Sequence, residues 1–203
     1  MAYWSVAIIQ MWGTVRQLLN QTPRRVSRLR TSARRTLAST NVSATSRRSD
    51  GTNIVAGRLE MDSHADTIVF GRNFLPLSFT GCECDVSPYT DDYDSIKNIP
   101  IATAATAWTC LDTAQTYILV FQEGLWMPDS MPNSLINPNQ LRTYGTVVQD
   151  KPFSSSPMYI EDVDGQVLIP LVAQGTTIVV DTRTPTSEEL MTCPHVVLSS
   201  ELP

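Results

Sequence analysis

Cysteine and histidine are scarce in this sequence, which limits the kinds of site it can build. The 203 residues include four cysteines and two histidines. Four cysteines are too few for a disulfide scaffold of this length, and Cys82 and Cys84, separated by one residue, are poorly spaced for a disulfide with each other. No Cys-x-x-Cys or His-x₃-His spacing occurs. We therefore expect no metal site and no cofactor, and reduced thiols in the cytoplasm.

Long apolar runs are also missing near the start of the chain. Ala2–Gly13 is apolar but only twelve residues long, whereas a membrane-spanning helix needs about 20. The arginines follow this run, while a secretory signal places its positive charge first. We predict no membrane span.

Acidic residues are nearly absent from the first fifty positions. Residues 1–50 hold nine arginines and one acidic residue, a net charge of +8, whereas residues 51–203 hold six basic and nineteen acidic residues, a net charge of −13. This asymmetry predicts a disordered, solvated basic arm over residues 1–55. Two alternatives stay open: organelle targeting by residues 1–40, and phosphate contact with a nucleic acid. No aromatic residue is interleaved among these arginines, so base stacking has no support.

The rest of the chain is organised around a short polar stretch between two apolar strands. Leu59–Met61 predicts the first strand because its apolar positions alternate. Thr67–Phe70 predicts the second because it is β-branched and aromatic. The residues that join them are small or polar, as in a turn, and read Asp62-Ser63-His64-Ala65-Asp66-Thr67.

This stretch resembles the active-site loop of retropepsins, the aspartic proteases of retroviruses and LTR retrotransposons, whose usual form is Asp-Ser/Thr-Gly-Ala-Asp-Thr. The resemblance implies that Asp62 is the catalytic acid and that the Ser63 hydroxyl braces the loop against a second copy. Asp66 and Thr67 would support the following turn. In such a site two carboxylates share one proton, so one acts as a base on water and the other as an acid.

His64 stands where the family has glycine. Glycine lets backbone amides approach the carboxylate and tolerates unusual backbone angles, and we expect a histidine to lose both freedoms. The alternative interpretation of Asp62–Thr67 is an ordinary polar hairpin turn.

A second motif lies 75 positions further along, at Leu135-Ile136-Asn137. It resembles the strand end before the helix of retropepsins, with asparagine in place of a glycine. Asn137 suits a helix N-cap and Pro138 the first helical position. Gln140 occupies the capping-box position and Gly145 suits the position after the helix, so a helix over 138–144 is predicted. Trp126-Met127-Pro128 and Ser134–Leu141 are similar to a stretch of copia-type elements.

Two further β-like runs, Ile99–Cys110 and Thr116–Phe121, flank Leu111–Gln115 and predict a long hairpin. The resemblance implies that this region supplies a flap over the substrate cleft, with Trp108 packed beneath it. An ordinary structural hairpin is the alternative. Phe74–Thr80 predicts a strand that ends in a turn at Gly81.

The carboxyl-terminal part predicts short strands and one brief helix that starts with a capping box at Thr186. Asp181-Thr182-Arg183 resembles the second catalytic loop of a two-lobed, pepsin-like protease. Arg183 replaces the glycine of that loop with a bulky cation, so a surface strand end fits better.

Together these features predict a mainly β chain: a retropepsin-like acid-protease protomer with one short helix over residues 56–148, preceded by the basic arm and followed by a small β-rich extension over residues 149–203. The implied function is that of a retrotransposon-derived aspartic endopeptidase that cleaves polyprotein peptide bonds as a homodimer. The first alternative, motivated by His64, is a catalytically inactive dimerisation or binding module. The second is an unrelated β-rich binding domain.

Overall fold

The computed structural model describes residues 54–87 and 94–199, and within them the protein is mainly β, as predicted. Most of the predicted basic arm and the apolar segment 2–13 lie outside the described residues. The strands are β1 (Ala56–Met61), β2 (Val69–Phe70), β3 (Leu75–Val86), β4 (Ile96–Thr109), β5 (Thr116–Trp126), β6 (Ser134–Ile136), β7 (Val147–Gln149), β8 (Tyr159–Glu161), β9 (Leu168–Pro170), β10 (Val172–Gln174), β11 (Thr177–Arg183) and β12 (His195–Val197). Two short helices are described, α2 (Pro138–Thr143) and α3 (Ser187–Thr192).

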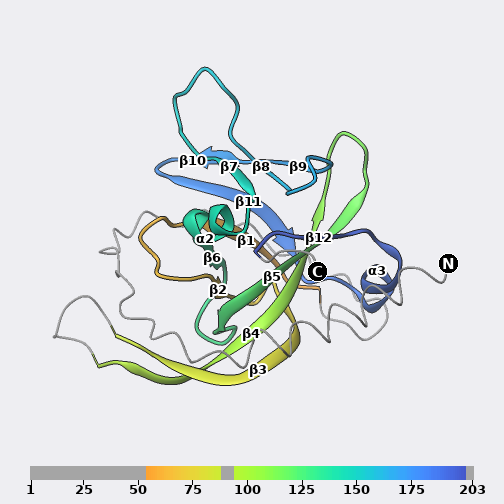
Figure 1. The fold of residues 1–203 in the computed structure, drawn as a ribbon. Helices are drawn as coiled ribbons and strands as arrows, with labels where there is room; N and C mark the ends of the chain where they lie inside the picture. Colours follow the sequence, from red (N-terminus) through yellow and green to blue (C-terminus); the bar gives the residue numbers. More distant parts are fainter. Residues whose placement is uncertain (1–53, 88–93, 200–203) are drawn as a thin grey trace.

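Nine strands form one sheet that closes on itself (Figure 1). Its order is β10-β11-β1-β6-β2-β5-β4-β3, with β12 beside β5. A single further pairing, between Arg183 of β11 and Ala107 of β4, joins the two sides and completes a ring of six strands. β1 pairs in parallel with β6, and β2 pairs in parallel with β5, so the chain on both sides of Asp62 is held by strands that come much later in the sequence.

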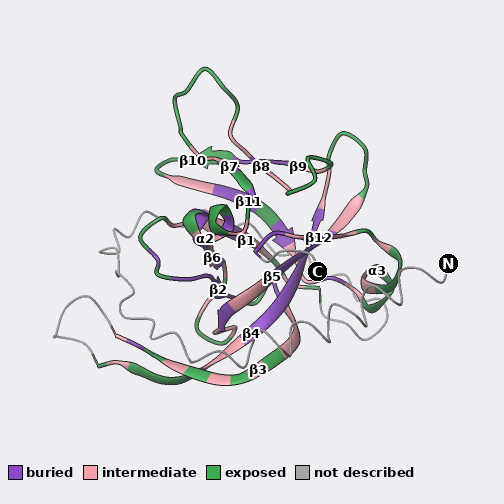
Figure 2. Cartoon of the chain, viewed as in Figure 1, coloured by how far each residue is buried: buried purple, intermediate pink, exposed green. Residues whose placement is uncertain are grey.

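The main core lies inside this closed sheet, where β4 and β5 are buried over most of their length (Figure 2). Phe70, Phe74 and Phe121 stack in tilted and edge-to-face contacts, with centroid distances of 4.8 and 5.5 Å. Gly124 makes this packing possible because a Cβ at that position would lie 2.3 Å from the Phe70 ring.

A buried polar network centred on Asn73 links β4, β6 and β11 inside the core. The Asn73 side chain, fully buried, donates to the Thr182 hydroxyl at 2.8 Å and accepts from the Ser134 hydroxyl at 2.7 Å. Ser134 in turn accepts from the Gly71 amide at 2.8 Å, and the Thr106 hydroxyl lies 2.8 Å from the Asn73 carbonyl. Each buried polar side chain therefore has a partner, which is the condition under which burying it is tolerated.

β3 and β4 form the longest hairpin, which curves away from the closed sheet (Figure 1). The strand predicted over Phe74–Thr80 does not end at Gly81 as expected. Gly81 has φ +78° at an irregularity in the pairing, and β3 then continues to Val86. A β-bulge explains the difference because it inserts a residue and bends a strand without ending it.

β7, β8 and β9 form a separate three-stranded antiparallel sheet. Val148, Ile160 and Ile169 are cross-strand neighbours and are all buried, which packs one face of this sheet onto the core. The later strands β10 and β11 return to the main sheet, where β11 pairs with β1 over five residues. The main sheet therefore includes strands from both sides of the predicted division at 148/149.

The two helices begin at the predicted caps. Asn137 accepts hydrogen bonds from the amides of Asn139 and Gln140, and Gly145 follows the helix at φ +86°. Thr186 and Glu189 form a complete capping box at α3, as predicted. Gln140 does not complete a capping box at α2, because its side chain binds the Asp62 loop instead.

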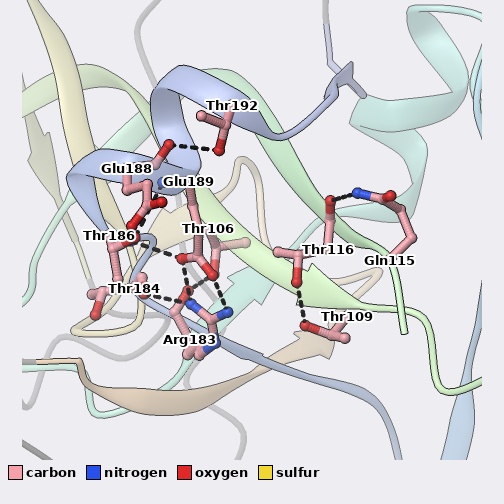
Figure 3. A network of polar contacts seen from close by, with 10 residues as sticks. All are labelled: Thr106, Thr109, Gln115, Thr116, Arg183, Thr184, Thr186, Glu188, Glu189 and Thr192. Atoms are coloured by element: carbon pink, nitrogen blue, oxygen red, sulfur yellow. Dashed lines mark hydrogen bonds and ion pairs between the residues drawn. The ribbon is translucent and has the colours of Figure 1, made fainter. Parts of the chain in front are cut away.

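Helix α3 is attached to β11 by an ion pair (Figure 3). The Arg183 guanidinium donates to both carboxylate oxygens of Glu189, at 2.7 and 2.5 Å. These hydrogen bonds lower the pKa of Glu189 and raise that of Arg183, each by favouring the charged form. Both side chains are mostly buried, so the pair fixes the helix against the strand that closes the sheet.

Candidate active site around Asp62

The Asp62 loop starts where β1 ends. Met61 is the last residue of β1, and the Asp62 amide donates to the Ile136 carbonyl at 3.0 Å. The chain then turns, with the Ala65 amide donating to the Asp62 carbonyl at 3.3 Å. Ala65 is buried and Asp66 is exposed, so the loop has a packed side and a solvent side.

The structure brings the second motif directly against this loop. β6 lies between β1 and β2, with Leu135 opposite both Glu60 and Val69. Ile136, opposite Met61, is fully buried. The two motifs are therefore adjacent in the structure.

Asn137 and Gln140 hold the loop from the helix side. The Asn137 side chain caps α2 with its oxygen and donates from its nitrogen to the Ala65 carbonyl at 2.5 Å. The side-chain oxygen of Gln140 accepts from the Ile68 amide and from the Thr67 hydroxyl, both at 3.0 Å. Two side chains from one helical turn thus fix the backbone on both sides of Asp66.

The carboxylate of Asp62 remains partly accessible within this frame. Its side chain is 29% exposed, and its Oδ1 accepts from the His64 amide at 2.9 Å. The His64 ring nitrogen Nδ1 lies 3.9 Å from the same oxygen, and the Ser63 hydroxyl lies 3.4 Å from that nitrogen. A carboxylate that one amide holds and solvent reaches is suited to acid–base chemistry on a bound molecule.

Histidine at position 64 keeps one of the two freedoms of glycine, and the loop does not use the other. The His64 amide does approach the carboxylate, at 2.9 Å. His64 is also not among the described residues with positive φ, which are Asn98, Ala114, Glu123 and Phe153 apart from glycines. The loop has a conformation that any L-residue can adopt, so the freedom of glycine is not needed here.

Asn137 likewise does not use the left-handed region that its glycine-like position allows. Its backbone is extended, at φ −79° and ψ 111°. Its side chain instead makes the cap and the bond to Ala65, so asparagine contributes hydrogen bonds that glycine could not.

Sequence reasoning missed two supporting residues, Gln140 and Glu123. Gln140 was expected to complete a helix cap, and only the folded chain shows that Thr67 and Ile68 compete for its side chain. Glu123 lies at a bulge of β5 with φ +57°. Its carbonyl lies 3.2 Å from the Thr67 hydroxyl, and its carboxylate accepts from Tyr144 at 2.9 Å. No local pattern marks such a bulge in advance.

Asp181, the other candidate carboxylate, lies away from this loop. It is in the middle of β11, opposite Arg58 of β1, with which it forms an ion pair at 3.3 Å. Arg58 precedes Asp62 by four residues, which is about 13 Å along a strand. Two carboxylates that far apart cannot share a proton. Asp181 is on the surface, as expected, but it lies within β11 and not at the end of the strand.

The hairpin predicted over residues 99–121 forms, but it does not cover Asp62. Its turn, Leu111–Gln115, follows β4 and precedes Thr116. Leu125, which contacts Ile68 beyond the Asp62 loop, lies nine residues after Thr116, or about 30 Å along β5. Trp108 stacks on Tyr117 near the turn, at 5.7 Å. The turn of this hairpin therefore lies at the end of β5 that is far from the Asp62 loop, and it does not form the expected flap over that loop.

No group of three potential metal ligands gathers within residues 54–87 and 94–199. No helix in these ranges is long and apolar enough to cross a membrane. All four cysteines lie in the described part and are free thiols.

Comparisons with known proteins gave no assignment: no family model matches the chain, and neither the curated proteins nor the solved structures searched include a match.

Proposed function

We propose that this chain is a retropepsin-like aspartic endopeptidase from a copia-type retrotransposon polyprotein, and that it hydrolyses peptide bonds as a homodimer. One observation carries the proposal. The second motif holds the Asp62 loop in place. β6 pairs with both β1 and β2, and the Asn137 side chain donates a hydrogen bond to the Ala65 carbonyl. An ordinary hairpin turn would not need a distant strand and helix to hold it.

The homodimer follows from the number of usable carboxylates. Water attack on a peptide bond in this chemistry needs two carboxyl groups that share one proton. Asp181 is excluded by its place opposite Arg58. A second copy of Asp62, related by a two-fold axis, would supply the partner.

In the proposed reaction the ionised Asp62 takes a proton from water while the water oxygen bonds to the peptide carbonyl carbon. The protonated Asp62 of the other copy donates to the carbonyl oxygen. Collapse of the resulting tetrahedral species breaks the C–N bond, and a carboxyl group protonates the leaving amine. The hydrogen bonds that the Ile136 carbonyl and the Gln140 side chain accept, and the one that Asn137 donates, would keep each carboxylate in place.

The β3–β4 hairpin is the better candidate for a flap. β4 pairs with β5 at Ile101 and Leu125, next to the β2 segment that follows the loop. From there β3 and β4 run on towards residues 87 and 94, beyond the end of β5 that pairs with β2. An extended peptide between this hairpin and the loop is the proposed substrate geometry.

The alternative function is an inactive dimerisation or binding module. The His64 side chain favours it, because it is 65% exposed beside Asp62, where it could exclude a substrate. His64→Gly separates the two functions. If only this variant cleaves peptides, the histidine disables the wild type. The wild-type backbone favours activity, since the His64 amide reaches the carboxylate as a glycine amide would.

The direct test is a peptide-library cleavage assay at mildly acidic pH, combined with sedimentation equilibrium. We expect a dimer whose activity a statine-type inhibitor blocks. Activity that persists in Asp62→Asn would overturn the proposal. A cytoplasmic location and weak nucleic-acid contact through the Arg-rich arm accompany the proposal as expectations, and the free thiols are compatible with the former.

A further inference from the structure

The sheet formed by β7, β8 and β9 has one face towards the core and one face towards solvent. Val148, Ile160 and Ile169 are buried, so their neighbours along each strand point outwards. These outward residues form two rows across the strands, and together they are called the outer face: Val147, Glu161 and Leu168 in one row, and Gln149, Tyr159 and Pro170 in the other.

Exposed apolar side chains gather at the outer face and its edges. Ten large hydrophobic side chains are exposed in the described part of the chain, and five of them lie within residues 147–172. Val147 and Leu168, on the outer face itself, are 47% and 54% exposed. The other three are Phe153, Val163 and Val172, from the β7–β8 loop, the β8–β9 turn and β10. Apolar side chains that gather in this way indicate an interaction surface, whereas scattered ones do not.

The same region is acidic. Residues 147–174 hold one lysine and four acidic residues, a net charge of −3, and the acids are Asp150, Glu161, Asp162 and Asp164. Glu161 and Asp164 take part in none of the ion pairs described within residues 54–87 and 94–199. A nucleic acid or an anionic lipid surface would be repelled here, and two copies of the face would bring two Glu161 carboxylates together. A matching partner is therefore both basic and apolar.

A cavity of about 560 Å³ beside the outer face offers room for a basic side chain. Asp162 and Asp164 line it, together with residues from the end of α2 and from β12. Arg142, the cation of this lining, is already bonded to Asp150 at 2.7 Å. Burial lowers the pKa of His195, so that ring is neutral at pH 7 and does not repel a cation. The carboxylates of the β8–β9 turn therefore give the cavity a surplus of negative charge.

We propose that the outer face binds the Arg-rich arm of the same chain, at residues 24–35. This segment has the matching chemistry, because its twelve positions hold six arginines, no acidic residue and the apolar side chains of Val26 and Leu29. Its charge is opposite to that of the face, just as residues 1–50 carry +8 and residues 51–203 carry −13. The inference goes beyond the proposed function and does not depend on it, since neither Asp62 nor a dimer takes part.

The chain between the segment and the body is long enough for this contact. Residues 36–53 supply eighteen positions, which span up to about 60 Å when extended. Val55, just after them, is fixed by the hydrogen bond from its amide to Thr184. Thr184 lies five positions from Val179, about 17 Å along the strand direction, and Val179 pairs with the exposed Val172. Residues 24–35 can therefore reach the outer face of their own chain.

The test is limited trypsin digestion of the full chain, followed by mass spectrometry. Trypsin cuts after arginine, so the six arginines of residues 24–35 report on binding, and Arg47 and Arg48 provide an internal reference. A bound segment is cut only while it is released. We expect the double variant Glu161→Gln/Leu168→Ser to raise the cleavage rate within residues 24–35, relative to the reference, by about threefold to tenfold. Equal ratios in wild type and variant would overturn the proposal, and an arm reserved for nucleic acid would give that result.

The matched control is Glu188→Gln/Met191→Ser. It also removes one exposed acid and one exposed apolar side chain, but from α3, which lies apart from the β7–β9 sheet (Figure 1). We expect it to leave the ratio at the wild-type value, and an increase equal to that of Glu161→Gln/Leu168→Ser would contradict the assignment to the outer face.

Two measurements on the wild type need no substitution. Raising the salt concentration from 0.05 to 0.5 M should increase the ratio, because salt screens the attraction between the arm and the acids. A ratio that does not respond to salt would overturn the proposal. The ratio should also be the same at low and high protein concentration. Protection that grows with protein concentration would place the arm on a second copy and overturn the assignment to the same chain.

Discussion

Two stretches of this chain read alike and behave differently. Met61-Asp62-Ser63 and Val180-Asp181-Thr182 both place an acid and a hydroxyl after an apolar residue. The first follows the end of β1 and turns into a loop that a distant strand and helix hold. The second continues through β11, with Asp181 ion-paired to Arg58 and Thr182 bonded to the buried Asn73.

This difference shows that an apolar residue followed by an acid and a hydroxyl residue is not enough to define the site. What distinguishes Asp62 is where the strand stops. A strand that continues leaves its side chains alternating between two faces, so Asp181 points to solvent and is 79% exposed. A strand that stops frees the backbone to turn, and side chains such as Asn137 and Gln140 can then hold that turn.

The largest expected effect compares the two acids directly. Asp62→Asn should reduce peptide cleavage by about 10⁴-fold, because an amide can neither take nor share the proton. Asp181→Asn should leave cleavage within about twofold, since it alters only an exposed pair. The measurement is kcat/KM on the same peptide with both variants. Equal losses would erase the distinction between the two stretches.

The second largest effect is expected from removing the hydrogen bonds by which Asn137 holds the Asp62 loop. Asn137→Ala should lower the free energy of unfolding by about 2–4 kcal/mol, because it deletes a helix cap and leaves the Ala65 carbonyl without its bond. Denaturant titration measures this change. Asn139→Ala is the control, since Asn139 is exposed in the same helix and should cost about 0.5 kcal/mol. If the two variants were equally stable, the loop would not depend on the second motif.

β11, the strand that contains Asp181, is held to α3 by the ion pair between Arg183 and Glu189. Glu189→Gln should cost about 1–2 kcal/mol at neutral pH, because glutamine can still cap α3 but cannot form the ion pair. The pKa of Glu189 is lowered in the folded protein, so this stability is present above the unfolded pKa and is lost as pH falls through the lowered value. Thermal unfolding should therefore show a gap between wild type and variant that closes in acid. Glu188→Gln, at an exposed neighbour, should show no such gap at any pH.

The smallest effect concerns the pair of Arg58 with Asp181. A double-mutant cycle should give a coupling of about 0.2–0.5 kcal/mol, because the two side chains are exposed and screened. A coupling above about 1 kcal/mol would mean that Asp181 has a structural duty that its exposure does not suggest.

Local patterns predicted the turn and the helix caps of the site, but they did not predict how its elements are positioned relative to one another. The turn at Asp62, the cap at Asn137 and the capping box at Thr186 depend on neighbours within a few residues, so the sequence was enough. The predicted hairpin at residues 99–121 also formed, but its position relative to Asp62 depends on the register of β4 against β5, which the sequence does not state.

Other features arise only from contacts between distant segments. Gln140 can cap its own helix or bind Thr67 and Ile68, and only the closeness of the loop decides between them. Asn73 reads as a turn residue, yet it becomes the centre of a buried network because β1, β6 and β11 meet there. In both cases tertiary contacts overrode the local signal.

Because β11 comes late in the sequence, its pairing with β1 forms late during synthesis. The bond between the Val55 amide and Thr184 spans 129 positions, so β1 waits for its partner until most of the chain has been made. Contacts of such long separation slow folding. Until β11 arrives, β1 has an unpaired edge that another nascent chain could occupy. A truncated product that stops before β11 should therefore aggregate as it emerges, even though it contains both halves of the Asp62 site.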